Sequence, residues 1–163
     1  MKRLRVRDIM TTKVITLSRS ATTGEAARKL SDHRISGAPV LEGERIVGVV
    51  SKSDLLDMRT RSSREGQLTV DDVMTHLIFG VRPGDPAMLA VRLMVEEGIH
   101  RVVVVNEAGK LAGIISPMDV LRALCRGERV TELEADIPVY EGHADAAVAV
   151  QYVDLREAQE SAA

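Results

Sequence analysis

Two serine–aspartate pairs have the residue types and spacing to hold a ligand: Ser51 with Asp54, and Ser116 with Asp119. A glycine stands three residues before each serine, so both read Gly-x-x-Ser-x-x-Asp and the glycine permits close backbone approach. A carboxylate can accept two hydrogen bonds from a cis-diol, and a serine hydroxyl beside the free amides of a helix start can meet a phosphate oxygen. The same spacing also describes a capping box that only satisfies a helix terminus, and spacing alone favours that interpretation. The duplicated context and the preceding glycine reverse this preference and favour ligand binding.

His100 and Arg101 form a third candidate, directly before the apolar residue Val102. An arginine presents a planar fork of donors that suits phosphate oxygens, and an imidazole beside it adds a further donor. The alternative is an exposed histidine with a surface salt bridge from Arg101 to Glu96 or Glu97. The residues leave these two interpretations nearly equal.

No catalytic or metal constellation can be assembled from the remaining side chains. There is no Ser-His-Asp or Cys-His pairing, P-loop or pair of catalytic carboxylates, so we expect a non-catalytic protein without a bound metal. The single Cys125 predicts a core or surface thiol, because one cysteine cannot form an internal disulfide. Four methionines are predicted to fill the core rather than bind a soft metal: Met10, Met74, Met94 and Met118.

The elements that must position these residues occur twice. Val-Arg-Asp-Ile-Met-Thr at residues 6–11 matches Val-Asp-Asp-Val-Met-Thr at residues 70–75, an offset of 64. Helical patterns over residues 22–34 and 86–98 follow at the same offset. We therefore predict a first repeat over residues 1–60, a linker over 61–69, a second repeat over 70–126 and an acidic tail of unknown structure over 127–163.

Each repeat is predicted to contain a short strand, a helix, two strands and a helix. Thr22 and Glu25 have capping-box spacing, and Pro86 is suited to the first position of a helix. Short β-branched runs flank turns at residues 42–44 and 106–110, which predicts two hairpins whose strands are covered on both faces. The fold class is thus α/β, or α+β, with two β-α-β-β-α repeats packed in pseudo-twofold symmetry around equivalent clefts.

Composition narrows the class of partner. Of the 163 residues 45% are hydrophobic but only 2% aromatic, which argues against stacking on nucleic-acid bases. Residues 1–126 carry a net charge of +5 and residues 127–163 carry −7, so a basic body is joined to an acidic tail. No apolar run reaches the 18 or so residues of a membrane span and no signal-peptide pattern follows Met1, so we expect a cytoplasmic protein without a membrane partner.

These marks, in the same order twice, resemble a tandem pair of cystathionine β-synthase (CBS) domains, called a Bateman module. The resemblance covers about residues 6–126; it lies in the Asp-Ile-Met-Thr and Asp-Val-Met-Thr segments, in residues 36–40 and in the two closing Gly-x-x-Ser-x-x-Asp motifs. The second repeat departs from the pattern by having Val103 where the first has Pro39.

The resemblance implies a regulatory sensor that binds an adenosyl ligand, namely AMP, ADP, ATP or S-adenosylmethionine, with no obligatory cofactor. It assigns the last aspartate of each motif to the ribose hydroxyls and a His-Arg pair to phosphate. It also implies a homodimer and an effector protein that responds to ligand binding. The sequence does not identify this effector. The ligand-binding residues it predicts are Ser36, Gly37, Ala38, Pro39, Ser51, Asp54, His100, Arg101, Val102, Ser116 and Asp119.

Two other functions stay open. The first is a structural protein that dimerises through helical edges such as Asp8-Ile9-Met10 and Val120-Leu121-Leu124, with its clefts empty. The second is a nucleic-acid-binding protein that uses the basic body, which the few aromatic residues disfavour. Nucleotide-induced stabilisation separates the sensor from the first, and salt-dependent binding to RNA or DNA identifies the second.

Overall fold

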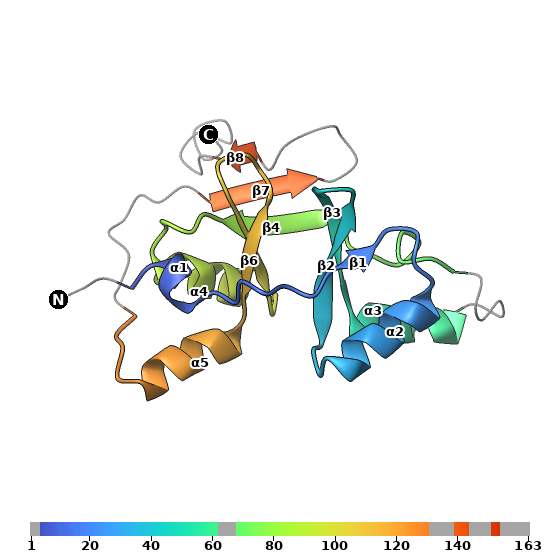
Figure 1. Cartoon of the computed structure of the whole chain (residues 1–163), viewed down its shortest axis with the longest axis horizontal. Helices are drawn as coiled ribbons and strands as arrows, with labels where there is room; N and C mark the ends of the chain where they lie inside the picture. Colours follow the sequence, from blue (N-terminus) through green and yellow to red (C-terminus); the bar gives the residue numbers. More distant parts are fainter. Residues whose placement is uncertain (1–3, 62–67, 131–138, 144–150, 154–163) are drawn as a thin grey trace. The chain divides into compact units, whose positions relative to one another are not determined.

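A computed structural model of the chain describes residues 4–61, 68–130, 139–143 and 151–153. The chain divides into two compact units, of which unit 1 combines Met1–Lys13 with Ile78–Gly142 and unit 2 is built on Val14–Leu77. Both mix helices with a β-sheet, as the repeats predict (Figure 1). Each unit is described by itself below.

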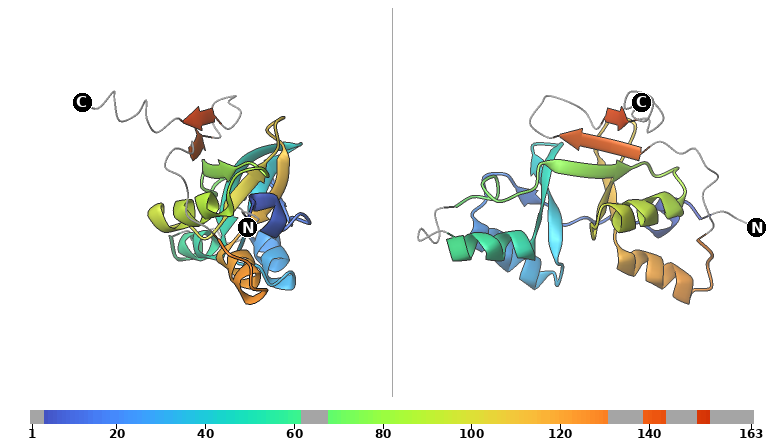
Figure 2. Two further views of the ribbon diagram at one scale, coloured as in Figure 1. Left: turned by 90° about the vertical axis from the view of Figure 1, so that its left-hand side faces the viewer. Right: turned by 180° about the vertical axis from the view of Figure 1, so that it is seen from behind.

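Unit 2 contains a three-stranded sheet in the order β1-β2-β3. The first pair of strands is parallel and the second antiparallel, with the predicted turn between β2 and β3. Helices α2 and α3 lie side by side in the views of Figures 1 and 2. The elements are β1 (Leu17–Ser18), α2 (Thr23–Asp32), β2 (Gly37–Glu42), β3 (Arg45–Ser51) and α3 (Lys52–Arg61).

The predicted cap starts α2. The backbone N–H of Thr22 donates to Glu25 Oε2 over 2.8 Å, and the Glu25 N–H donates to Thr22 Oγ1 over 3.2 Å, so the capping box is confirmed. One face of α2 then buries Ala26 and Leu30 against Val40, Val47 and Val50 of the sheet, and this apolar contact holds the unit together.

Unit 1 contains a five-stranded sheet in the order β6-β5-β4-β7-β8. Strands β4 and β5 are parallel and β5 and β6 antiparallel, which repeats the pattern of unit 2. Helices α1, α4 and α5 pack together. The elements are α1 (Val6–Ile9), β4 (Leu77–Val81), α4 (Ala87–Glu96), β5 (Val102–Val105), β6 (Leu111–Ile115), α5 (Pro117–Cys125), β7 (Val139–His143) and β8 (Gln151–Val153).

Strand β5, which lies inside the sheet of unit 1 between β6 and β4, confirms the prediction of strands covered on both faces. All four valines of β5 are at most 4% exposed, and Leu89 and Leu93 of α4 are 2% exposed in the same unit. A run of β-branched residues without alternation is what such a strand requires. The core of this unit is aliphatic, in keeping with the low aromatic content.

The acidic tail contributes two of the five strands. Strand β7 lies beside β4, and β8 pairs with it in antiparallel register, with Tyr140 opposite Tyr152 (Figures 1 and 2). The rest of the predicted tail after Val130 lies outside the described residues. The tail therefore extends the sheet of unit 1 at a strand that would otherwise be its edge.

The two Met-Thr segments have exchanged places between the repeats. Residues 6–11, here the first arm, belong to the first sequence repeat but pack in unit 1 with the strands of the second. Residues 70–75, the second arm, pack in unit 2 with the strands of the first. The arms make matching backbone pairs: Thr11 with Ile114 of β6, and Thr75 with Val49 of β3.

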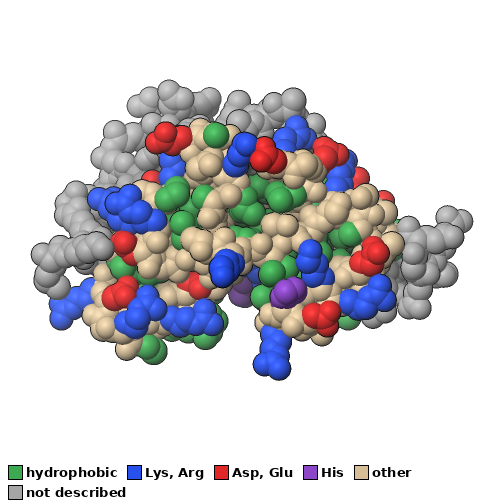
Figure 3. Space-filling view, in the orientation of Figure 1, with side chains coloured by type: hydrophobic (Ala, Val, Ile, Leu, Met, Phe, Trp, Pro, Cys, Tyr) green, Lys and Arg blue, Asp and Glu red, His purple; other side chains and the backbone are tan. Residues whose placement is uncertain are grey.

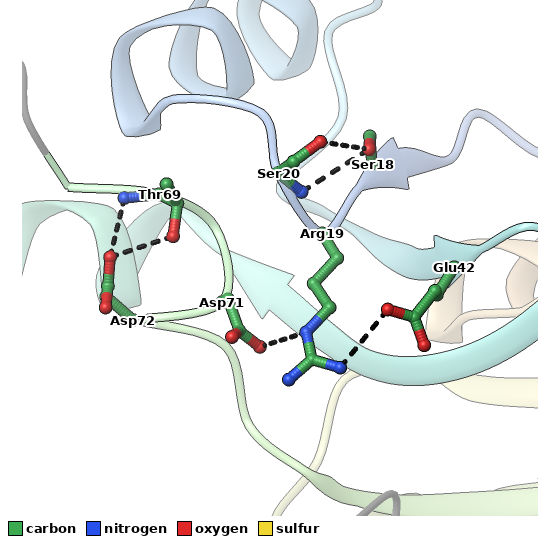
Figure 4. A network of polar contacts seen from close by, with 7 residues as sticks. All are labelled: Ser18, Arg19, Ser20, Glu42, Thr69, Asp71 and Asp72. Atoms are coloured by element: carbon green, nitrogen blue, oxygen red, sulfur yellow. Dashed lines mark hydrogen bonds and ion pairs between the residues drawn. The ribbon is translucent and has the colours of Figure 1, made fainter.

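A polar network fastens the second arm in unit 2 (Figure 4). Arg19 Nε lies 2.7 Å from Asp71 Oδ1, and Arg19 Nη1 lies 3.4 Å from Glu42 Oε1 at the end of β2. The hydrogen bond to Asp71 raises the pKa of Arg19. Asp72 accepts hydrogen bonds from the backbone N–H and the hydroxyl of Thr69, each over 2.8 Å, and these bonds lower its pKa. Arg19, which directly follows β1, thus joins the arm to the end of β2.

Three expectations at single positions were wrong. Pro86 is the N-cap of α4, which begins at Ala87, because its backbone is still extended and bridges to Arg5. Met118 is 54% exposed on α5 rather than in the core. Ile9, predicted on an exposed edge, is 7% exposed because α1 packs against α4 and α5. In the described ranges no helix combines the length and apolarity needed to cross a bilayer.

Candidate functional site

Ser51 and Asp54 lie where β3 ends and α3 begins. Asp54 Oδ2 accepts hydrogen bonds from the backbone N–H and the hydroxyl of Ser51, both over 2.7 Å, and the Asp54 N–H donates to Ser51 Oγ over 3.3 Å. Gly37, at the start of β2, is the strand partner of Ser51. The capping interpretation of this pair is therefore confirmed, and the pair fixes a half-buried carboxylate at one end of the sheet.

Ser116 and Asp119 occupy the equivalent place between β6 and α5. Asp119 Oδ2 accepts from the Ser116 N–H over 2.8 Å and from its hydroxyl over 2.6 Å. The other oxygen, Oδ1, accepts from the hydroxyl of Thr11 over 3.1 Å and from Arg122 Nη1 over 3.3 Å. Asp119 is 7% exposed, which makes it the buried charged residue of the described chain. A buried carboxylate needs such donors.

The two motif glycines make room for the arms. A Cβ atom on Gly113 would lie 2.8 Å from the sulfur of Met10 and 3.0 Å from the carbonyl oxygen of Thr11. A Cβ atom on Gly48 would meet the sulfur of Met74 at 2.7 Å and the carbonyl oxygen of Thr75 at 2.9 Å. The close approach that a glycine permits is therefore made here by the chain itself, which explains both glycines without a ligand.

The other predicted ligand-binding residues lie at the same ends of the two sheets. In unit 2, Ser36 is exposed and precedes β2, whose first residues are buried; Lys52 of α3 donates its backbone N–H to the Ser36 carbonyl over 2.9 Å. The buried residues are Gly37, Ala38 and Pro39.

In unit 1, exposed His100 and half-buried Arg101 precede buried Val102, which pairs with Ile115, the residue before Ser116. Glu96, one suggested partner of Arg101, forms an ion pair with Arg92 over 3.0 Å. Each unit thus brings its predicted residues to one sheet end. Whether they hold a ligand stays a prediction.

Thr11 is the residue that the motifs did not single out. It is 108 positions from Asp119 in the sequence, and no local spacing relates the two. The available signal was that a threonine closes both arms, at residues 11 and 75. Among the described residues no group of three or more His, Cys, Asp or Glu side chains could hold a metal ion.

The family model of the CBS domain matches residues 6–60 and 70–126. CBS domain-containing protein YhcV of Bacillus subtilis is 31% identical over 115 residues, covering 71% of this chain and 81% of YhcV. Inosine-5'-monophosphate dehydrogenase of Korarchaeum cryptofilum is 35% identical over 107 residues, which are 66% of this chain and 21% of that enzyme. The chain also spans only 40% to 50% of three Methanocaldococcus jannaschii relatives.

Solved structures agree with the family model. CBSX2 of Arabidopsis thaliana, a CBS-pair protein, is 30% identical with a TM-score of 0.67, covering 77% of this chain and 96% of that one. CBSX2 solved in complex with AMP is 31% identical at the same TM-score, with 77% and 98% covered. The repeated strand–helix–strand–strand–helix order, the duplicated Ser-x-x-Asp corners and these likenesses lead to one conclusion: the chain belongs to the CBS domain family and carries two CBS domains in tandem.

Proposed function

We propose that this chain is a non-catalytic regulatory module that binds an adenosyl ligand at the sheet ends where Asp54 and Asp119 lie. The observation that carries the proposal is the likeness to CBSX2, which was solved in complex with AMP and is 31% identical over 77% of this chain. The matching family is that of a regulatory domain, which supports regulation rather than catalysis. AMP, ADP, ATP and S-adenosylmethionine are the candidate ligands.

The proposal gives each predicted residue a role. Asp54 and Asp119 accept the ribose hydroxyls, since a carboxylate fixed by its neighbouring serine is already oriented. Arg101 with His100 binds phosphate, because a guanidinium forms charge-assisted hydrogen bonds to phosphate oxygens. Ser51 and Ser116 add ribose or phosphate contacts, and the walls are formed by Ser36, Gly37, Ala38, Pro39 and Val102.

Regulation would act through a shift of population. A ligand favours whichever arrangement of the module binds it more tightly, by no more than the difference in affinity, and an effector protein responds to that arrangement. The module is proposed to work as a homodimer. Three apolar side chains of α5 are about half exposed and would gain from a matching surface: Met118, Leu121 and Leu124.

The test is a thermal-shift screen of the full chain with AMP, ADP, ATP, NAD and S-adenosylmethionine, followed by calorimetry on the ligand that stabilises it. Asp119→Ala should weaken a nucleotide and adenosine alike, by about ten- to a hundredfold. Arg101→Ala should weaken a nucleotide with several phosphates more than adenosine. Asp32→Ala, at an exposed position on α2, is the control. Absence of any shift, with a dimer in sedimentation, would favour a purely structural protein.

The alternative function, nucleic-acid binding, would require a basic surface that contacts phosphates. On the face shown in Figure 3, basic side chains are interspersed with acidic ones rather than gathered in a continuous patch. A nucleic-acid partner would bind through phosphate contacts, so its affinity would fall steeply with salt. Titration of labelled RNA and DNA at two salt concentrations tests this, and tight, salt-dependent binding would replace the sensor proposal.

A further inference from the structure

The two proposed ribose-binding carboxylates differ in how fully their hydrogen-bonding positions are used. An ionised carboxylate has about four lone-pair positions, two on each oxygen. On Asp119, Oδ2 accepts two donors from Ser116, and Oδ1 accepts one from Thr11 and one from Arg122. All four positions therefore have a donor.

The carboxylate of Asp54 accepts fewer hydrogen bonds than that of Asp119 from the side chains and backbone that the structure describes. Its Oδ2 accepts both donors from Ser51, as in the other unit, but within residues 4–56 and 68–130, whose side chains the structure describes, no hydrogen bond reaches Oδ1. Thr75, the counterpart of Thr11, pairs through its backbone with Val49, and within the same ranges its hydroxyl donates to no carboxylate. The arms match in their backbone bonds and differ in this side-chain bond.

We infer that Thr11 is a built-in competitor for the ribose position on Asp119. A ribose diol can take Asp54 Oδ1 directly, whereas on Asp119 it must first displace the Thr11 hydroxyl. The inference rests on the proposed function and adds a difference between its two ribose contacts. Thr11 lowers the affinity of a ribose for the Asp119 position, and loading of that position releases a side chain of the first arm.

Exposure makes Thr11 the displaceable donor. The Thr11 side chain is exposed, so its hydroxyl can turn to water when it leaves the carboxylate. Arg122 is 64% exposed, so its contact contributes little and can shift without much cost. The Asp119 side chain is only 8% exposed, so the donor that replaces Thr11 has to enter the site. A ligand hydroxyl is such a donor.

The test measures AMP binding to the full chain by calorimetry. Thr11→Val keeps the shape of the side chain and removes the hydroxyl, so it should tighten AMP binding at the Asp119 position by about three- to tenfold. Thr11→Ser keeps the hydroxyl and should behave as the wild type. Thr75→Val is the matched control in the other arm and should leave both affinities within about twofold.

A ligand analogue identifies the contact. With 2',3'-dideoxyadenosine monophosphate, which lacks both ribose hydroxyls, the gain from Thr11→Val should disappear. AMP binding that is equal in Thr11→Val and Thr75→Val would overturn the inference and leave the proposed function intact. A wild-type chain that binds none of the adenosyl ligands would overturn both.

Discussion

The hydrogen atom that serves as the side chain of Gly113 faces the sulfur of Met10 and the carbonyl oxygen of Thr11. Gly113→Ala places a Cβ atom 2.8 Å and 3.0 Å from these atoms, and the carbonyl belongs to a backbone bridge that cannot easily move. The free energy of unfolding should fall by about 1–3 kcal/mol in urea titrations. Gly84→Ala, with nothing within 4 Å of the new atom, should be nearly neutral. Equal losses in the two variants would refute this explanation of the motif glycine.

Asp85 offers a pH-dependent test at the same scale. Burial raises the pKa of this carboxyl, although it accepts the Arg82 N–H over 2.7 Å. A raised pKa means that the folded state holds the proton more tightly, so the wild type loses stability as pH rises through that pKa. Asp85→Asn keeps an acceptor and removes the charge, so it should be more stable at pH 7, with the difference closing in acid. Urea titrations between acidic pH and pH 7 measure the difference in the free energy of unfolding between the two proteins. A difference that does not vary with pH would contradict the prediction.

At the scale of elements, β7 covers the edge of β4. Tyr140→Pro removes a backbone donor in β7 while the tail keeps its length and charge, and proline is poorly tolerated inside a sheet. The amides of β4 should then exchange hydrogen faster, and the uncovered edge should make the variant associate more than the wild-type chain does. Hydrogen exchange and sedimentation measure the two effects, with the amides of β5 as the internal control. Unchanged exchange in β4 would show that the tail does not protect it.

Elements governed by local chemistry were predicted well. The Thr22–Glu25 cap, the hairpin turns and the buried run of β5 follow from residue types a few positions apart, and the structure has them all. The exchange of arms could not be predicted, because each repeat shows the same pattern whichever partner its arm contacts. The exposure of Met118 was missed for a related reason: its side chain type fits a core, but α5 turns this residue outward.

In the candidate site, too, the features set by local sequence were predicted and those set by the tertiary fold were not. The motifs located the Ser-Asp corners correctly, while their spacing could not separate a cap from a ligand site, and the structure shows that the cap is formed. The Thr11 contact to Asp119 spans 108 positions, so it depends on the tertiary fold. The sequence therefore predicts where the two carboxylates lie, but it does not predict which residues donate hydrogen bonds to their oxygen atoms.

At the scale of the whole molecule, the exchanged arms make each unit a product of both sequence repeats. A protease site placed within residues 62–67 would cut the chain between the repeats. The two pieces should stay together in native buffer, because each buries an arm of the other: residues 6–11 in unit 1 and residues 70–75 in unit 2. Size-exclusion chromatography of the cut protein should show one peak that separates only in denaturant. Two peaks without denaturant would contradict the exchange.

The exchange also bears on how such a chain can arise by gene duplication. In a single repeat, the strand that carries the motif glycine would leave a space beside that glycine. In this fold the space is occupied by the arm of the other repeat. One copy alone would leave this space unfilled, and two copies would complete each other by trading arms. Fusion of two such genes would then preserve contacts that already existed between separate molecules. After fusion the two arms could acquire different contacts. Within residues 4–56 and 68–130 the threonine hydroxyl of the first arm donates to a carboxylate and that of the second arm does not, which is a difference of this kind.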